Sequence, residues 1–283
     1  MKKILFISFP LVLLGLYSCG DYEDNNIQVK ETSIELDTTD LSNDYNFTPP
    51  SPLKVASIFR KAGLKYDENL LNPTSNINKY STYNQKALNF GIYSSDLAYC
   101  ILNKQSEKGA DYLKAIRQLG TDIGLATIFN SDDLINRFEA NISNTDSIVE
   151  LLTDIQSQTD DYIQENGENE LAVIYYTGAW VEGMYFGAKT AMDSKDRKLG
   201  GKLSEQMNIA NTILKGFEAI KVKQGDIIEL EAAMRELVDM FNNFESVKAI
   251  GDDIDFLDAE LSQKEVASLA GKIIELRTKI TQP

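Results

Sequence analysis

Two acidic residues lie in stretches of the sequence that otherwise favour a protein core. Asp96 is surrounded, at the helical spacings of three, four and seven residues, mainly by apolar and aromatic residues. Glu182 is the only charged residue between Ala172 and Ala188. Because an unpaired buried carboxylate is costly, we expect each acid either to have a hydrogen-bonding or ionic partner or to stay protonated.

These two acids define a candidate ligand pocket. If their helices are neighbours, Asp96 and Glu182 would face one another beside aromatic side chains. The aromatic members of this candidate pocket are Tyr99, Trp180 and Tyr185. Two carboxylates with phenol donors suit a cation, an amine or a sugar hydroxyl, and paired carboxylates also carry out glycoside hydrolysis. The alternative is structural: each acid binds a helix end, a lysine or an arginine within the core, and the aromatic residues belong to that core.

The composition excludes most other chemistry. The chain of 283 residues contains no histidine, which rules out histidine-based serine or cysteine triads and metal sites that need imidazole. Its two cysteines cannot form a cysteine-rich metal site, so we expect no metal, no cofactor and no catalytic residue. The formal net charge is -15 at pH 7, and an acidic surface repels phosphate backbones, so we expect no nucleic-acid partner.

The N-terminus has the pattern of an export signal. Lys2 and Lys3 precede the apolar run Ile4–Leu16, which is shorter than the roughly 20 residues of a membrane-spanning helix. The sequence Leu16-Tyr17-Ser18-Cys19 resembles the lipobox of bacterial lipoproteins. The resemblance implies that residues 1–18 are a signal peptide, that cleavage precedes Cys19, and that a diacylglyceryl group on its sulfur attaches the protein to the membrane.

The residues after Cys19 are expected to form a flexible tether. The acidic run Gly20-Asp21-Tyr22-Glu23-Asp24 is similar to the signal that sends Bacteroidota lipoproteins to the outer face of the outer membrane, which favours surface display over a periplasmic orientation. Residues 19–50 are polar, end in Pro49-Pro50 and show no helical period. Since acylation of Cys19 leaves Cys100 without a disulfide partner, Cys100 is expected to be a small buried apolar residue.

From residue 51 to residue 283 the sequence predicts one all-α domain, because apolar residues recur at three- and four-residue spacing. Ser51 and Pro52 are expected to start the first helix, and Gly63 to end it. The longer helices are expected at about residues 82–104, 107–127, 131–142, 145–166, 168–193, 197–221, 226–247 and 262–281. About eight or nine helices would form a single irregular multi-helix bundle or a short solenoid of stacked hairpins.

One expected helix differs in character from the others. The helix over about residues 168–193 is apolar on all sides, which indicates a central position in the domain. A transmembrane interpretation is disfavoured because the apolar stretch is short and contains Glu182. Gly91, Gly178, Gly183 and Gly187 fall within expected helices, where they predict close helix crossings or space for a ligand.

Two segments behind the lipobox, together with it, resemble an all-helical Bacteroidota lipoprotein family of uncharacterised function. They are Tyr93-Ser94-Ser95-Asp96-Leu97-Ala98-Tyr99 and Gly178-Ala179-Trp180-Val181-Glu182-Gly183-Met184-Tyr185. The resemblance spans most of the domain and implies the helical fold and an envelope location. It implies no activity and no catalytic residue.

These observations favour a non-enzymatic binding or scaffold module that is anchored by lipid in the cell envelope. Its expected partner is an envelope protein or a small ligand. The alternative is a carboxylate-dependent hydrolase that uses Asp96 and Glu182 on an extracellular, glycan-like substrate.

Overall fold

The computed structural model describes residues 51–282 except for residues 131, 194–196, 224 and 251–259, and these described residues belong to one compact unit. Cys19, the expected signal peptide and the expected tether lie outside the described residues. Every regular element in the described part of the chain is a helix, which confirms the all-α prediction.

The described helices number twelve α-helices and two short 3₁₀ helices, η1 and η2. Their bounds are α1 Pro52–Lys61, η1 Glu68–Leu70, η2 Thr74–Lys79, α2 Tyr83–Leu102, α3 Ser106–Asp122, α4 Ala126–Phe129, α5 Asp132–Ala140, α6 Thr145–Asn166, α7 Asn169–Asp193, α8 Arg197–Glu205, α9 Met207–Ala219, α10 Gly225–Asn242, α11 Glu245–Lys248 and α12 Gln263–Thr281.

Local capping signals set several helix ends where the sequence predicted them. Ser51 caps α1, its Oγ accepting a hydrogen bond from the Lys54 backbone N–H at 3.3 Å, and Pro52 follows at the first helical position. Gly167 ends α6 in the left-handed conformation with a φ of 68°. These ends are decided by residues within one turn of one another, so they could be predicted without knowledge of the fold.

The predicted number of eight or nine helices is wrong because three expected helices are divided. Gly124, with a φ of 96°, separates α3 from the short helix α4. A break at Gln206 separates α8 from α9, and there the Gln206 carbonyl accepts hydrogen bonds from Trp180 Nε1 at 3.3 Å and from the Ile209 backbone N–H at 3.1 Å. The third division, at residues 243–244, separates α10 from α11.

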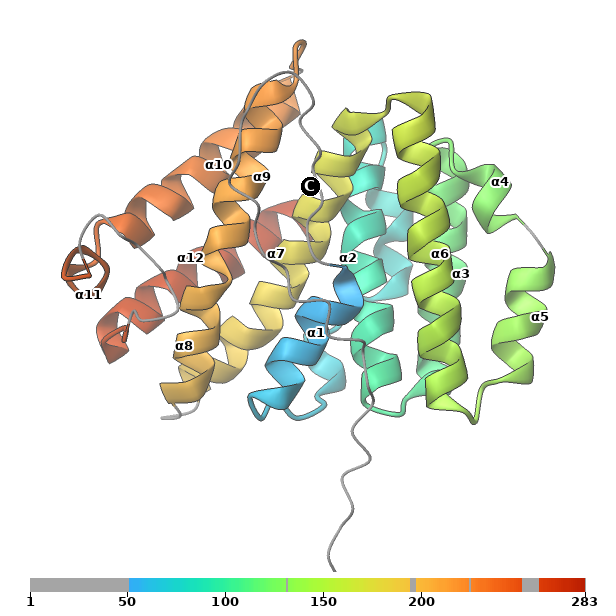
Figure 1. Ribbon diagram of the computed structural model, residues 1–283, viewed down its shortest axis with the longest axis horizontal. Helices are drawn as coiled ribbons and strands as arrows, with labels where there is room; N and C mark the ends of the chain where they lie inside the picture. Colours follow the sequence, from blue (N-terminus) through green and yellow to red (C-terminus); the bar gives the residue numbers. More distant parts are fainter. Residues whose placement is uncertain (1–50, 131, 194–196, 224, 251–259, 283) are drawn as a thin grey trace, which may run out of the picture. The chain divides into compact units, whose positions relative to one another are not determined.

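The central helix is α7, as its uniformly apolar sequence predicted. It contacts α1, α2, α6, α8, α9 and α12. Figure 1 shows α7 between two groups of helices, with α2, α3 and α6 on one side and α9, α10 and α12 on the other. Residues from helices far apart in the chain therefore meet on α7.

The crossing of α2 and α7 brings the two backbones into direct contact. A Cβ atom added at Gly91 would lie 1.9 Å from the Tyr175 carbonyl oxygen, and one added at Gly178 would lie 2.0 Å from the Leu88 carbonyl oxygen. Both distances are far below van der Waals contact, so only glycine fits at either position. Close helix crossing is thus the reason for these two glycines.

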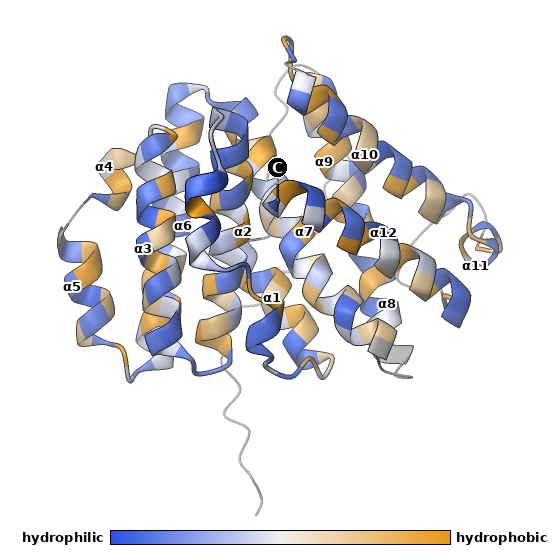
Figure 2. Ribbon diagram, turned by 180° about the vertical axis from the view of Figure 1, so that it is seen from behind, coloured by the Kyte–Doolittle hydropathy of each residue, from blue (hydrophilic) through white to orange (hydrophobic). Residues whose placement is uncertain are grey.

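The outer helices have one buried and one exposed face. Figure 2 shows hydrophilic and hydrophobic residues mixed along α3, α10 and α12, as expected for helices at the edge of a core. None of the helices in the described part of the chain has the length and apolar character needed to span a bilayer, and this includes α7.

Candidate functional site

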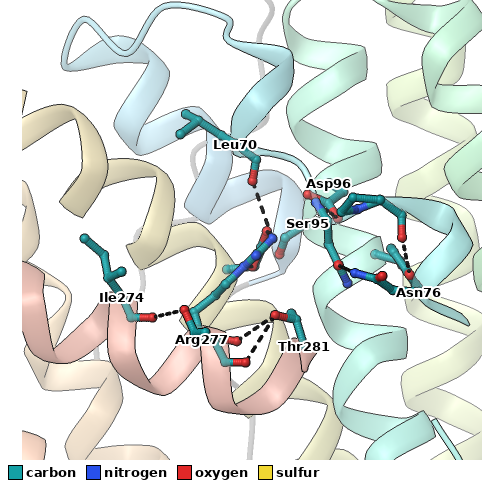
Figure 3. A network of polar contacts seen from close by, with 12 residues as sticks. Leu70, Asn76, Ser95, Asp96, Ile274, Arg277 and Thr281 are labelled. Carbon is teal, nitrogen blue, oxygen red and sulfur yellow. Dashed lines mark hydrogen bonds and ion pairs between the residues drawn. The ribbon is translucent and has the colours of Figure 1, made fainter. Parts of the chain in front are cut away.

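Asp96 and Glu182, the two acids singled out in the sequence, meet in the core beside Arg277. We call these three residues the carboxyl–arginine cluster; they come from α2, α7 and α12. Arg277 donates from Nε to Glu182 Oε2 and from Nη2 to Glu182 Oε1, both at 2.8 Å. Asp96 and Glu182 are 0% exposed, and Arg277 is 8% exposed. Figure 3 shows Arg277 reaching from α12 towards the Leu70 carbonyl, with Asp96 nearby on α2.

The surroundings of Asp96 favour its protonated form. Burial raises the pKa of Asp96 well above its usual range, and the neighbouring Glu182 charge raises it further, while Arg277 opposes the shift. The Asn72 backbone N–H donates to Asp96 Oδ2 at 3.3 Å, whereas Oδ1 accepts no hydrogen bond from the described residues. A proton on Asp96 allows its carboxyl group to donate to Glu182. The cluster then contains one negative and one positive charge.

Arg277 is the member of the cluster that was not singled out in the sequence. Burial disfavours its charge, but the ion pair with Glu182 raises the pKa of Arg277 above its ordinary value. Its guanidinium also lies 4.5 Å from the centre of the Tyr185 ring, a cation–π contact. The sequence contained a pattern that could have indicated burial of Arg277. This residue lies on the same face of α12 as Ala270, Ile273 and Ile280, which are all buried.

The other two members of the predicted pocket lie away from the carboxyl–arginine cluster. Tyr99 donates its hydroxyl to the Lys65 carbonyl and accepts from the Asp67 backbone N–H, both at 2.8 Å, so it fixes the segment before η1. Trp180 donates to Gln206 at the break between α8 and α9. The structure therefore brings together Asp96, Glu182 and Tyr185, and directs Tyr99 and Trp180 to structural contacts.

The cluster has the features of a structural ion pair rather than of a reactive site. Both carboxylate oxygens of Glu182 bind one guanidinium, which takes the place that a bound cation or amine would occupy. Among the described residues no group of histidine, cysteine and acidic side chains could hold a metal ion. Nearby, Cys100 is a buried free thiol, as predicted, and burial raises its pKa to about 12, which makes it a poor nucleophile.

A separate apolar pocket lies between α2, α3 and α6, bounded also by the start of α1, by Phe129 of α4 and by Tyr175 of α7. Its volume is about 90 Å³, and about 640 Å³ when the open space around it is included. Its apolar walls include Phe90, Leu97, Leu113, Ile116, Phe129 and Leu152. A concave, mainly apolar site with a few polar groups is the usual form of a small-molecule site.

A compact polar network borders this pocket. Tyr175 and Tyr176 donate their hydroxyls to the same Asp160 oxygen, Oδ1, at 2.7 and 2.8 Å. Gln156 Nε2 lies 2.9 Å from that oxygen, 3.0 Å from the Tyr175 hydroxyl and 2.8 Å from the Tyr176 hydroxyl. Gln156 and Tyr175 also line the pocket. Sequence reasoning missed this site because its residues are distributed over helices whose packing no local pattern specifies.

The chain was compared with protein-family models, curated proteins and solved structures, and none of them matches it.

Proposed function

We propose that this chain is a non-enzymatic binding module, anchored in the cell envelope by lipid on Cys19, and that it takes a small, largely apolar ligand in the pocket between α2, α3 and α6. The acidic residues after Cys19 favour display on the outer face of the outer membrane over a periplasmic orientation. The pocket between α2, α3 and α6 supports the proposal of a small ligand.

The observation that carries this proposal is the contrast between the pocket and the carboxyl–arginine cluster. The pocket is apolar, concave and reachable, and polar groups stand on its wall. Asp96 and Glu182 are fully buried, and Glu182 is already bound by Arg277. The first site is partly open and contains no ion pair that a ligand must displace, whereas the ion pair of the second site would have to break before a ligand could bind.

The same contrast weighs against the alternative hydrolase. Acid–base chemistry by Asp96 and Glu182 requires a substrate within hydrogen-bonding distance of both groups. Neither side chain has exposed surface in the described structure. Turnover of a glycan substrate that Asp96→Asn abolishes, with the helical content unchanged, would instead favour the hydrolase.

The lipid anchor is tested by metabolic labelling. Palmitate should be incorporated into the wild-type protein and not into Cys19→Ala, because the lipid is expected on the Cys19 sulfur. Cys100→Ala is the matched control, since Cys100 is the other cysteine and is buried; it should retain the label. Unlabelled wild-type protein that still begins at Met1 would overturn the anchor.

Ligand binding in the pocket is tested with benzene, an apolar probe that has no polar group. Saturation-transfer NMR on the mature chain should detect benzene, and Ser94→Leu should abolish the signal because it fills the pocket. Thr190→Leu is the matched control: Ser94 and Thr190 each donate to the carbonyl four residues earlier and are part-buried, but Thr190 lies outside the pocket. Equal signals in the two variants would contradict the assignment of the site.

A further inference from the structure

We propose that the pocket selects apolar compounds that end in a hydrogen-bond donor, a primary amine or an alcohol, and that it rejects compounds that end in a carboxylate. This inference rests on the proposed function, because it concerns the ligand class of the same pocket. It follows from the direction of the hydrogen bonds that the wall residues already make.

The wall hydroxyls of α2 and α6 have no hydrogen left to donate to a ligand. Ser94 donates to the Phe90 carbonyl at 2.7 Å, Thr153 to the Val149 carbonyl at 2.8 Å, and Thr159 to the Ile155 carbonyl at 2.8 Å. Each hydroxyl has a single hydrogen and two lone pairs. With the hydrogen committed to the helix backbone, each oxygen can only accept a hydrogen bond from a ligand.

The polar network leaves a further acceptor. Tyr175 donates its hydroxyl hydrogen to Asp160, and the two amide hydrogens of Gln156 are shared among three acceptors within 3.0 Å, the Asp160 oxygen and the two tyrosine hydroxyls. Gln156 Oε1 accepts no hydrogen bond from any described residue, and amide oxygens are strong acceptors. Because Gln156 lines the pocket, a ligand amine or hydroxyl that reaches Oε1 can donate to it, whereas a carboxylate there would place a second acceptor beside it.

The charge of α6 acts in the same direction. Between Thr145 and Asn166 this helix contains six acidic residues and no lysine or arginine; the acids are Asp146, Glu150, Asp154, Asp160, Asp161 and Glu165. None of these acids lines the pocket, but together they place a negative potential around it, which attracts an ammonium group and repels a carboxylate.

The start of α1 is the one part of the described lining with spare donors. Ser51 accepts from the Lys54 backbone N–H, so its own hydroxyl hydrogen remains, and the Leu53 backbone N–H lies in the first turn of the helix. An anionic head group bound at these donors would reverse the preference for amines and alcohols. The carboxylate arm of the experiment below measures this outcome directly.

The enclosed volume of the pocket limits the size of the apolar part of the ligand. A cavity of about 150 Å³ is known to take a benzene-sized molecule, and the volume here is about 90 Å³ before the open space is added. A ring or chain of six carbons therefore fits only if part of it occupies the open part of the pocket, which brings the volume to about 640 Å³. Three six-carbon compounds with different head groups therefore serve as matched probes: hexylamine, 1-hexanol and hexanoate.

The experiment measures the affinity of these three compounds by calorimetric titration at pH 7. The protein is the mature chain from residue 19 with Cys19→Ser, so that no attached lipid competes for the pocket. Hexylamine and 1-hexanol should bind at least about tenfold more tightly than hexanoate. This factor is expected when a hydrogen-bond acceptor of the wall faces the carboxylate, a second acceptor, and no hydrogen bond can form.

A side-chain variant tests whether the wall acceptor causes the preference. Gln156→Met keeps the length of the side chain and removes both Oε1 and Nε2, while Asp160 keeps its hydrogen bonds from Tyr175 and Tyr176. The difference between 1-hexanol and hexanoate should therefore shrink at least severalfold. Gln164→Met, on the exposed side of the same helix, is the control and should leave the difference unchanged. Circular dichroism of both variants verifies that the helices are retained.

The outcomes separate this inference from the function on which it rests. Hexanoate binding as tightly as 1-hexanol, or more tightly, would overturn the donor preference while the pocket remained a binding site. No binding of any six-carbon compound or of benzene would overturn the proposed function itself. An unchanged preference in Gln156→Met would remove Gln156 from the recognition of the head group and overturn the argument from its Oε1.

Discussion

The carboxyl–arginine cluster combines three ionisable side chains with almost no exposed surface. Charges in such a place are stable only when they are paired; here the Arg277 guanidinium binds Glu182, and burial raises the pKa of Asp96, which favours its neutral form. The geometry is bidentate, which is the strongest arrangement available to an arginine and a carboxylate. The cluster therefore joins α2, α7 and α12 through interactions that depend on one another.

Removing one partner of the ion pair should be much more costly than removing both. We expect Glu182→Leu to lower the free energy of unfolding by about 3 to 5 kcal/mol, because it leaves Arg277 buried and unpaired. Adding Arg277→Met to Glu182→Leu should restore part of the loss. Urea denaturation measures both.

The control is an exposed ion pair between α12, the helix that carries Arg277, and α10. Lys279 and Glu229 lie 3.2 Å apart with side chains 63% and 69% exposed, so Lys279→Met should change stability by less than about 1 kcal/mol. If Glu182→Leu were no more destabilising than Lys279→Met, the ion pair would contribute little to the core.

Asp96 makes a specific contribution to the pH dependence of stability. Its pKa is raised in the folded chain, so between its ordinary value of about 3.9 and the raised value the folded state holds a proton that the unfolded state has lost. The free energy of unfolding therefore falls as the pH rises through this window. Asp96→Asn cannot ionise, so its stability relative to the wild type should increase from pH 4 to pH 8.

Chemical denaturation at several pH values measures this difference. Asp111→Asn is the control, since the Asp111 side chain, on α3, is 57% exposed. Its difference from the wild type should vary much less with pH. Parallel stability curves for the wild type and Asp96→Asn would show that Asp96 is ionised in the folded protein.

At the scale of the helices, the crossing of α2 and α7 is what allows the cluster to form. Gly91 and Gly178 permit direct backbone contact, and one turn along α2 the Ser95 hydroxyl donates to the Ala179 carbonyl at 2.8 Å. Asp96 and Glu182 follow further along the same two helices. A wider crossing would separate the two carboxyl groups and admit water between them.

Alanine at these two glycines should be strongly destabilising. Gly91→Ala and Gly178→Ala each place a Cβ atom about 2 Å from a backbone carbonyl oxygen of the other helix. Overpacking usually costs about 1 to 3 kcal/mol, and a contact with rigid backbone should reach or exceed the upper value. Thermal and urea denaturation provide the measurement.

Gly271 offers a matched control within a helix. It lies on the exposed face of α12, and a Cβ atom added there would meet nothing within 4 Å. Gly271→Ala should raise stability by about 0.5 to 1 kcal/mol, because alanine is the better helix former. Equal effects at Gly91 and Gly271 would mean that α2 and α7 can move apart at little cost.

At the scale of the whole molecule, the acidic charge is the dominant long-range feature. The full chain has 28 basic and 43 acidic residues, and the proposed removal of residues 1–18 would leave 26 basic against 43 acidic residues. Such an excess destabilises the compact state through repulsion between like charges. It also opposes the approach of anionic ligands to the pocket beside α6.

Salt should therefore stabilise the mature chain. We expect the free energy of unfolding to rise between about 20 and 300 mM sodium chloride, because repulsion between exposed charges is screened over about a Debye length. The ion pair of the cluster is buried and should be affected little. A fall in stability over this range would mean that attractive surface ion pairs outweigh the net repulsion.

The sequence alone determined the helical class and most helix positions. The N-terminal cap at Ser51 and the C-terminal cap at Gly167 lie where local patterns predicted them, and the apolar surroundings of Glu182 correctly indicated a central helix. These features depend on residues within a few positions of one another. The breaks at Gly124 and Gln206 were missed, since apolar periodicity continues through both.

Only the tertiary structure decided which side chains meet. Glu182 and Arg277 are separated by 95 positions, and no local pattern specifies that α12 brings its arginine to α7. The pocket likewise depends on the relative placement of α2, α3 and α6. Helix formation follows from short-range hydrogen bonding and periodicity, whereas contacts between helices depend on how complete surfaces pack, so burial of the two acids could be predicted but their partner and the ligand pocket could not.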